Sequence, residues 1–214
     1  MKVAIIGATG FVGSAVLNEA LQRGHEVTAI ARNISKITTQ NEKLTTIEAD
    51  ANNSTSLTKV LAGHDAVVNA YNAGWTNPEY YNDFIEGSES IQQAVKLSGV
   101  KRLLIVGGAG SLEIAPGVQL VDTPGFPPEY KVAAGAARDY LNIIKKENDL
   151  DWTFLSPAIN LHPGTRTGKF RLGTDQPVFD DKNQSDISVE DMAVAIIDEL
   201  EQNHFIKKRF TLGY

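Results

Sequence analysis

The sequence predicts an α/β fold, a doubly wound parallel sheet in a single domain over residues 1–214, from two observations. Residues 2–24 run in the order apolar strand, glycine turn and amphipathic segment. Further along, short runs rich in β-branched residues alternate with segments whose apolar residues recur at helical spacing. Continuous apolar runs of this length are typical of strands that helices cover on both faces, as in parallel sheets. We expect a small substrate-side part towards the C-terminus.

Composition excludes several classes of protein. The 214 residues suffice for one domain with a full core, and the absence of cysteine excludes disulfides, thiolate metal sites and a cysteine nucleophile. We expect no metal. A formal net charge of -6 argues against nucleic acid as a partner, because binding to phosphates needs a basic surface. No apolar run approaches a membrane span and the N-terminus is already a core strand, so we expect a cytoplasmic protein with a small-molecule substrate and no membrane partner.

Three glycines, Gly7, Gly10 and Gly13, follow the first apolar run. The helix after them would present unpaired N–H groups and the positive end of its dipole, which suits a diphosphate. Gly7 would allow a tight turn, Gly10 a close approach of the phosphates, and Gly13 close packing of the helix on the strand. Such glycines also occur in purely structural turns, but the strand before them and the helix after them favour a Rossmann-like dinucleotide site.

The remaining elements follow from the same patterns. Strands are predicted at residues 27–30, 44–49, 65–70, 101–106, 152–155 and 209–212, the last of which closes the sheet. Helices are predicted after Gly13, from Asn53 or Ser54 to Gly63, from near Pro78 to Gly99, over residues 132–143, and from Ser188 to Leu200. Asp191 stands three residues after Ser188, the spacing of a capping box. Pro116–Pro128 is expected to be a restrained but irregular loop, of the kind that forms a substrate-side lid.

Two residues are candidates for the adenosine half of a dinucleotide. The second strand ends at Arg32, where an acid would bind the ribose of NAD and an arginine accommodates the 2′-phosphate of NADP. Arg32 therefore favours NADP, with NAD still possible, although a solvated surface arginine is the plainer alternative. Asp50, after the third strand, suits either the adenine amino group or a turn.

The nicotinamide half is expected at the ends of the next strands. Ligands of open parallel sheets lie at the carboxyl ends of the strands, so residues 69–75 should lie over the cofactor. The small residues of Gly107–Ser111 would leave room for a flat ring, although a flexible glycine turn explains them equally well. Beyond residue 158, His162, Arg166 and Lys169 either face an acidic substrate or are simply solvated, and the sequence does not decide between these alternatives.

These segments resemble a known family. The chain is similar over nearly its whole length to atypical short-chain dehydrogenase/reductases of the NAD(P)H-binding, NmrA-like type, and within them to bacterial proteins described as NADH-flavin reductases or NAD-dependent epimerase/dehydratases. The resemblance rests on residues 7–13, the strand that ends at Arg32, and residues 107–112, 151–158 and 187–191.

The resemblance implies a seven- or eight-stranded sheet and a set of binding residues. It implies that the diphosphate lies on Gly7, Thr9, Gly10, Phe11 and Val12, the adenosine on Arg32, Asp50 and Ala51, and the nicotinamide half near Ala70, Tyr71, Gly107, Ser156, Pro157 and Ala158.

One motif of the wider superfamily is missing. Most members use a tyrosine with a lysine four residues later, the lysine lowering the pKa of the tyrosine so that it can exchange a proton with the substrate. No tyrosine of this chain has that lysine; Tyr130, for example, is followed four residues later by Ala134. Epimerisation or dehydration of a sugar nucleotide needs such a group, whereas flavin reduction mainly needs two stacked rings.

The first hypothesis is therefore an NAD(P)H-dependent oxidoreductase that reduces a flavin or quinone-like ring, the flavin being substrate rather than bound cofactor. Ser111 and Tyr130 are the hydroxyls nominated near the hydride site, each as a positioning group rather than an acid. The second hypothesis is a non-catalytic protein that senses NADP(H). The third is an NAD-dependent sugar-nucleotide epimerase/dehydratase whose base comes from outside the usual helix. The sequence leaves the oligomeric state open.

Overall fold

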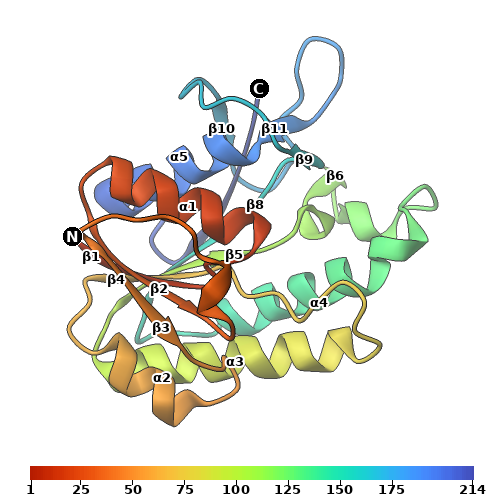
Figure 1. Ribbon diagram of the computed structural model, residues 1–214. Coiled ribbons are helices and arrows are strands. Elements are labelled where there is room, and N and C mark those ends of the chain that lie inside the picture. Colours follow the sequence, from red (N-terminus) through yellow and green to blue (C-terminus); the bar gives the residue numbers. More distant parts are fainter.

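An eight-stranded sheet forms the centre of the protein, in the order β10-β12-β8-β5-β4-β1-β2-β3 (Figure 1). The structure, a computed structural model, describes all residues from 1 to 214. The strands of this sheet are β1 (Lys2–Ile6), β2 (Glu26–Ala31), β3 (Leu44–Glu48), β4 (Ala66–Asn69), β5 (Arg102–Val106), β8 (Asp151–Ser156), β10 (Arg171–Gly173) and β12 (Lys208–Gly213).

The predicted fold class is confirmed, with one correction at the edge. Every neighbouring pair from β3 across to β12 is parallel, as in a Rossmann-like doubly wound sheet. The strand predicted at residues 209–212 does not close the sheet, because β10 pairs with β12 in antiparallel register outside it. The segment of β10 was missed as a strand because three residues with one large apolar side chain carry almost no pattern.

Helices cover both faces of the sheet (Figure 1): α1 and α5 lie above it in this view, and α2, α3 and α4 lie below. Successive side chains of each strand point to opposite faces, so Ile5 belongs to the core under α1 and α5 while Ile6 belongs to the core on the other side. The helices are α1 (Phe11–Gln22), α2 (Ser54–Leu61), α3 (Tyr80–Ser98), α4 (Pro128–Ile144) and α5 (Val189–Gln202).

Helix ends follow the predicted caps with one exception. Asn53 accepts a hydrogen bond from the Ser56 N–H at the start of α2, and α3 ends at Gly99 in left-handed conformation. Ser188 caps α5 by accepting from the Asp191 N–H at 3.1 Å. The predicted capping box is incomplete, however, because the Asp191 carboxylate accepts from other groups and the Ser188 N–H donates to the Tyr214 hydroxyl instead.

Short elements connect the main layers. The segment Pro116–Pro128 was expected to be irregular, but it contains β7 and η3, and the long α4 begins at its last residue. These short elements are the pair β6 (Glu113–Ala115) and β7 (Val118–Gln119), the pair β9 (Asn160–His162) and β11 (Asp186–Ser188), and the 3₁₀ turns η1 (Ile34–Lys36), η2 (Ala109–Ser111) and η3 (Leu120–Asp122). No helix of the structure is long and apolar enough to cross a membrane.

Candidate functional site

The carboxyl ends of the parallel strands meet at one edge of the sheet, opposite the edge where the N-terminus lies in Figure 1. The start of α1, the 3₁₀ turn η2 after β5 and the loop after β4 all leave from this edge. Residues that are distant in the sequence are therefore brought together there, as expected for the ligand site of an open parallel sheet.

The turn between β1 and α1 has no room for side chains at two of its glycines. Gly7 has a φ of 81°, and a Cβ there would lie 2.4 Å from the Ala70 carbonyl oxygen. A Cβ on Gly13 would lie 2.1 Å from the Gly7 carbonyl oxygen. Both distances are far below van der Waals contact, so the start of α1 packs directly on its own turn and on the end of β4. This explains two of the three glycines by packing, as predicted for Gly13.

The amides of this turn fit an anion. Gly10 is the N-cap of α1 and supplies no capping side chain, and the first turn holds no acidic residue. The backbone N–H groups of Thr9, Phe11, Val12 and Gly13 donate to no other group of the chain. With the positive end of the helix dipole behind them, these amides provide the donors that a diphosphate accepts from. The residues predicted to hold the diphosphate thus fit that group.

The residues predicted for the adenosine half lie at neighbouring strand ends. Arg32 makes no hydrogen bond or ion pair within the chain, so its guanidinium is free to bind a phosphate. Asp50 forms the turn that was the alternative interpretation, because its Oδ1 accepts from the Asn52 N–H at 3.0 Å. Ala51 is buried, and its carbonyl oxygen accepts from the Ser90 hydroxyl of α3 at 2.7 Å. Of the predicted set, Arg32 is the side chain most clearly available to a ligand.

Tyr71 follows β4 and is held against α3 rather than left free. Its N–H donates to Asn69 and its hydroxyl donates to the Asp83 carbonyl oxygen at 3.1 Å. The ring packs over Gly87, where a Cβ would lie 2.6 Å from it. Burial raises the pKa of Tyr71, and the nearby charge of Asp83 raises it further while that of Arg32 lowers it. The Tyr71 hydroxyl is therefore a poor proton donor and acceptor for a substrate.

The segment after β5 forms a regular 3₁₀ turn that packs against neighbouring elements. Ala109–Ser111 forms η2, and the Gly107 N–H donates to the Leu155 carbonyl oxygen at 2.8 Å. A Cβ on Gly107 would lie 2.0 Å from the Phe154 ring, and one on Gly110 would lie 2.7 Å from the Ala134 side chain of α4. The space beside these two glycines is thus filled by protein. The contact between Gly107 and the nicotinamide stays a prediction. It would have to be made by the backbone of Gly107, because the Phe154 ring fills the space on its Cβ side.

Ser111 and Ser156 are buried hydroxyls with different surroundings. Ser111 accepts from Arg209 Nη1 at 3.1 Å, and its carbonyl oxygen accepts from the same nitrogen at 2.8 Å. Ser156 is fully buried and its Oγ has no hydrogen-bond partner in the chain. Pro157 follows it and Ala158 is 1 % exposed, so this stretch lines the core side of the strand end. Roles for Ser111 and for residues 156–158 at the cofactor stay predictions.

Sequence reasoning missed Arg209 and Asp175. Arg209 lies on β12 with its side chain 5 % exposed, ion-paired with Asp175, and it connects β12 to η2 through Ser111. The Asp175 carbonyl oxygen accepts from the Glu113 N–H at 2.8 Å, so the loop after β10 is attached to the same place. The available signal was an arginine next to Phe210 in a predicted core strand, because a buried arginine is nearly always paired.

Tyr130 is on the first turn of α4 and is 51 % exposed. Its ring meets Trp75 edge to face, with centroids 6.0 Å apart. No hydrogen bond holds its hydroxyl within the chain. Tyr130 is therefore the nominated hydroxyl that a ligand can reach, whereas Ser111 is enclosed.

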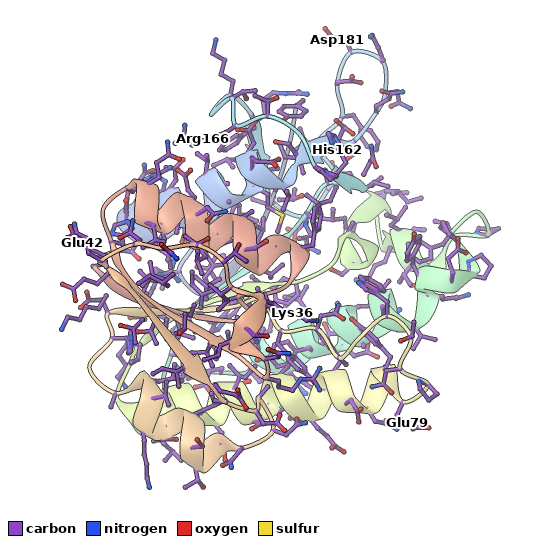
Figure 2. The ribbon with its side chains drawn as sticks, viewed as in Figure 1. Lys36, Glu42, Glu79, His162, Arg166 and Asp181 are labelled. Atoms are coloured by element: carbon purple, nitrogen blue, oxygen red, sulfur yellow. The ribbon has the colours of Figure 1, made fainter.

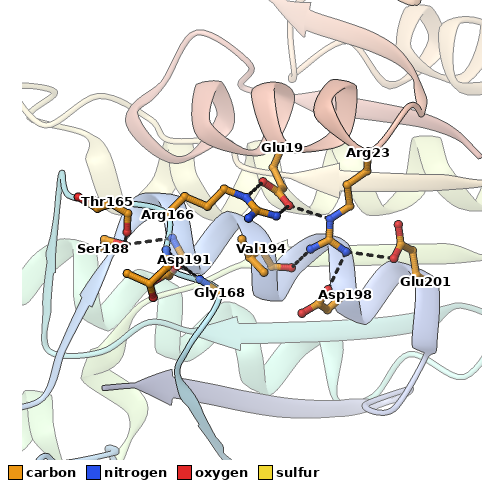
Figure 3. A network of polar contacts seen from close by, with 11 residues as sticks. Glu19, Arg23, Thr165, Arg166, Gly168, Ser188, Asp191, Val194, Asp198 and Glu201 are labelled. Carbon is orange, nitrogen blue, oxygen red and sulfur yellow. Dashed lines mark hydrogen bonds and ion pairs between the residues drawn. The ribbon is translucent and has the colours of Figure 1, made fainter.

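Two of the three basic residues of the segment after β9 pair with carboxylates of the chain. Arg166 pairs with the buried Glu19 of α1 through two hydrogen bonds of 2.6 and 2.8 Å (Figure 3), and His162 pairs with Asp186 at 2.9 Å. Figure 2 shows His162 and Arg166 on the α1 side of the molecule and Glu79 on the opposite side. Arg166 and His162 are solvated in part, with side chains 42 % and 36 % exposed, and each also has a partner within the chain. Lys169 is exposed and its side chain has no such partner.

Fold and glycine turn together define a Rossmann-like protein with a dinucleotide-type phosphate site. A family model described as NAD(P)H-binding matches residues 7–203, so the chain belongs to that family, and the resemblance found in the sequence is confirmed.

Relatives and solved structures agree with this assignment. The chain is 40% identical to the uncharacterized protein YwnB of Bacillus subtilis, over 99% of this chain and 98% of that protein. It is similar to a crystal structure from Bacteroides thetaiotaomicron, provisionally named an epimerase, with 47% identity, a TM-score of 0.93 and coverage of 100% and 96%. A Streptococcus pneumoniae structure, provisionally named an NADH-flavin reductase, matches with 37% identity, a TM-score of 0.84 and coverage of 100% and 99%.

Proposed function

We propose that the protein is an NAD(P)H-dependent oxidoreductase of the atypical short-chain dehydrogenase/reductase type that reduces a flavin or quinone-like ring. The observation that supports binding of a nicotinamide dinucleotide is the set of unpaired amides at the start of α1. The likeness to a structure named for NADH-flavin reduction supports the acceptor class. The flavin is a substrate in this proposal, not a resident cofactor.

The cofactor lies along the carboxyl edge of the sheet in this proposal. When bound, it supplies the hydride, and the chain binds and orients it. The residues we assign to it are Gly7, Thr9, Gly10, Phe11 and Val12 for the diphosphate, Arg32, Asp50 and Ala51 for the adenosine, and Ala70, Tyr71, Gly107, Ser156, Pro157 and Ala158 for the nicotinamide half. The free guanidinium of Arg32 favours NADPH over NADH, because the 2′-phosphate that it would bind is present only in NADPH.

The choice of acceptor follows from what the tyrosines of the chain can do. Burial raises the pKa of Tyr80 to about 12. Tyr140 is fully buried, which raises its pKa, and its hydroxyl donates to the Ser88 carbonyl oxygen. Neither has a lysine that would lower its pKa. A carbonyl or sugar substrate needs a proton from such a group, whereas a reduced flavin spreads its charge and takes its proton from water. Tyr130, the nominated hydroxyl that a ligand can reach, then positions the ring.

A direct assay tests the proposal. Purified protein is mixed with NADPH and FMN, riboflavin or a naphthoquinone, and the nicotinamide absorbance is followed. We expect turnover above the uncatalysed rate with at least one ring acceptor and a lower KM for NADPH than for NADH. Absence of turnover with every ring acceptor would remove the oxidoreductase proposal.

Two other functions make opposite predictions in the same experiment. A sensor of NADP(H) would bind both redox states with different affinity and transfer no hydride; the enclosure of Ser111 by Arg209 is the observation that favours it. A sugar-nucleotide epimerase/dehydratase, the class in the provisional name of the Bacteroides structure, would convert a UDP-sugar without net oxidation of NADPH. The missing tyrosine–lysine pair counts against it.

A further inference from the structure

Four aromatic rings stack in a column beside the proposed site. Trp75 stacks on Tyr80, with centroids 5.9 Å apart and planes at 27°. Tyr80 stacks on Phe84 at 5.8 Å and 8°, and Phe84 stacks on Tyr71 at 6.2 Å and 24°. The column thus runs from Tyr71, at the end of β4, to Trp75 in the loop before α3.

The outer end of this column is open. Tyr80 and Phe84 are 7 % and 6 % exposed, whereas Trp75 is 68 % exposed, the largest exposure of any aromatic side chain here. Aromatic side chains bury roughly 150–250 Å² each when they pack, so a tryptophan left in water forgoes a large stabilisation. One side of the indole packs on Tyr80, and 68 % of the side chain remains exposed to a further ring.

The loop that carries Trp75 is held in place by asparagines. Asn72 accepts from the Gly74 N–H at 2.8 Å and donates to the Tyr80 hydroxyl at 3.0 Å. Asn77 donates to the Asp83 carboxylate at 2.7 Å and accepts from the Glu79 N–H at 3.0 Å. The indole is therefore presented by an ordered loop, so a ligand would not have to order it on binding.

Trp75 also lies beside the nominated hydroxyl. The two rings, Trp75 and Tyr130 on the first turn of α4, meet in a T-shaped contact with centroids 6.0 Å apart and planes at 85°. One turn further along α4, Ala134 packs against Gly110 of η2, the segment that follows β5. These contacts connect Trp75 through α4 to the strand ends where the nicotinamide half is proposed.

From this geometry we infer that Trp75 is the residue that selects the acceptor, by stacking a fused planar ring on the exposed part of its indole, beside Tyr130. The inference rests on the proposed function and narrows its substrate class to rings of isoalloxazine or naphthoquinone size. Small aldehydes and ketones gain little from an indole face, because stacking grows with the area of ring that is covered.

The protein contains two tryptophans, which makes the inference directly measurable. Trp152 is 3 % exposed in the core, and Trp75 is in solvent. In Trp152→Phe, Trp75 is the one remaining tryptophan, and we expect FMN to quench the tryptophan emission saturably in the presence of NADP. The midpoint should match the KM of FMN in turnover.

Substitutions then separate stacking from a structural role. Loss of a stacking ring weakens binding by about tenfold or more. We therefore expect Trp75→Leu to raise the KM of FMN by about tenfold, with kcat and the KM of NADPH unchanged, and Trp75→Phe to restore most of the loss. Leu97→Ala is the matched control: Leu97 is 62 % exposed on the last turn of α3 and should leave every constant unchanged.

The outcomes distinguish the two proposals. Normal turnover by the unaltered protein together with an unchanged KM of FMN in Trp75→Leu overturns the role of Trp75 and leaves the proposed function intact. That role is overturned as well if Trp75→Leu alters only the sedimentation of the protein, which would make the indole a contact between copies. No turnover with any ring acceptor overturns the proposed function, and the acceptor role of Trp75 with it.

Discussion

At the scale of the residue, the glycine turn shows why a small set of positions determines the site. Gly7 and Gly13 are required by contacts of their own backbone, since a Cβ on either would overlap a carbonyl oxygen. Those contacts hold the α1 amides at the strand end. A substitution at Gly7 or Gly13 is therefore expected to displace the amides that would bind the phosphates.

We expect Gly13→Ala to lower affinity for NADPH by about tenfold or more, because the displaced helix start loses at least one hydrogen bond to a charged phosphate. Calorimetric titration with NADPH measures it. Gly135→Ala is the control: no heavy atom lies within 4 Å of a Cβ built at Gly135, and alanine favours the helix. Equal affinity in the two variants would contradict the placement of the diphosphate.

Arg32 decides between the two nicotinamide dinucleotides in our proposal. Arg32→Ala should weaken NADPH binding by about tenfold, the value of a charge-assisted bond to phosphate, and leave NADH binding nearly unchanged. Lys59→Ala, an exposed cation on α2, should change neither. Parallel losses for both dinucleotides in Arg32→Ala would show that the arginine acts on something other than the 2′-phosphate.

At the scale of the element, α1, α5 and the segment after β9 are joined by a partly buried charge network (Figure 3). Glu19 of α1 accepts from Arg23 on one side and from Arg166 on the other. Arg23 also pairs with Asp198 and Glu201 of α5. Because the Glu19 side chain is 3 % exposed, its negative charge depends on both arginines for compensation. The ion pair between Arg166 and Glu19 attaches the segment after β9 to α1.

Arg166→Ala should therefore lower the free energy of unfolding, because it leaves the buried Glu19 carboxylate without one of its partners. Urea unfolding followed by circular dichroism measures this change. Lys169→Ala, three residues away and without a side-chain partner, should stay within about 0.5 kcal/mol of the unaltered protein. If both variants unfold alike, Arg166 is not the residue that attaches the segment.

At the scale of the whole molecule, three carboxylates connect segments that are distant in the sequence, and each has a lowered pKa. Hydrogen bonds from Arg166 and Arg23 lower the pKa of Glu19, and hydrogen bonds from Thr167, Gly168 and Tyr214 outweigh burial at Asp191. Glu147 joins α3 to the turn after α4; hydrogen bonds from Asp149, Gln92 and Lys96 outweigh burial and lower its pKa to about 2.

A carboxylate whose pKa is lower in the folded state than in the unfolded state makes the protein less stable as the pH falls. The stabilisation by Glu147 is complete above its unfolded pKa of 4.5 and is lost as the pH falls towards about 2. We expect the free energy of unfolding to decrease through that window, and Glu147→Gln to reduce the decrease by roughly 2 kcal/mol. Urea unfolding at a series of pH values checks this. An identical pH profile for the variant would show that Glu147 contributes no such linkage.

The elements of the fold were predicted well because strand patterns and helix caps depend on residues that are neighbours in the sequence. The β-branched runs, the cap at Asn53 and the end of α3 at Gly99 need only neighbouring residues, and all are where they were expected. The errors fall where partners come from far along the chain: β10 pairs with β12, Asp191 binds Thr167 rather than its own helix, and Arg166 binds Glu19 across 147 positions.

The sequence by itself determined the doubly wound fold, the glycine turn and the missing tyrosine–lysine pair, since periodicity, glycine spacing and residue identity are all readable along the chain. Tertiary structure alone decided that Arg209 encloses Ser111, that Arg166 pairs with Glu19, and that Trp75 ends an aromatic column with most of its side chain exposed. The physical reason is that burial and pairing depend on which distant segments pack together, and a linear pattern carries no information about that distance.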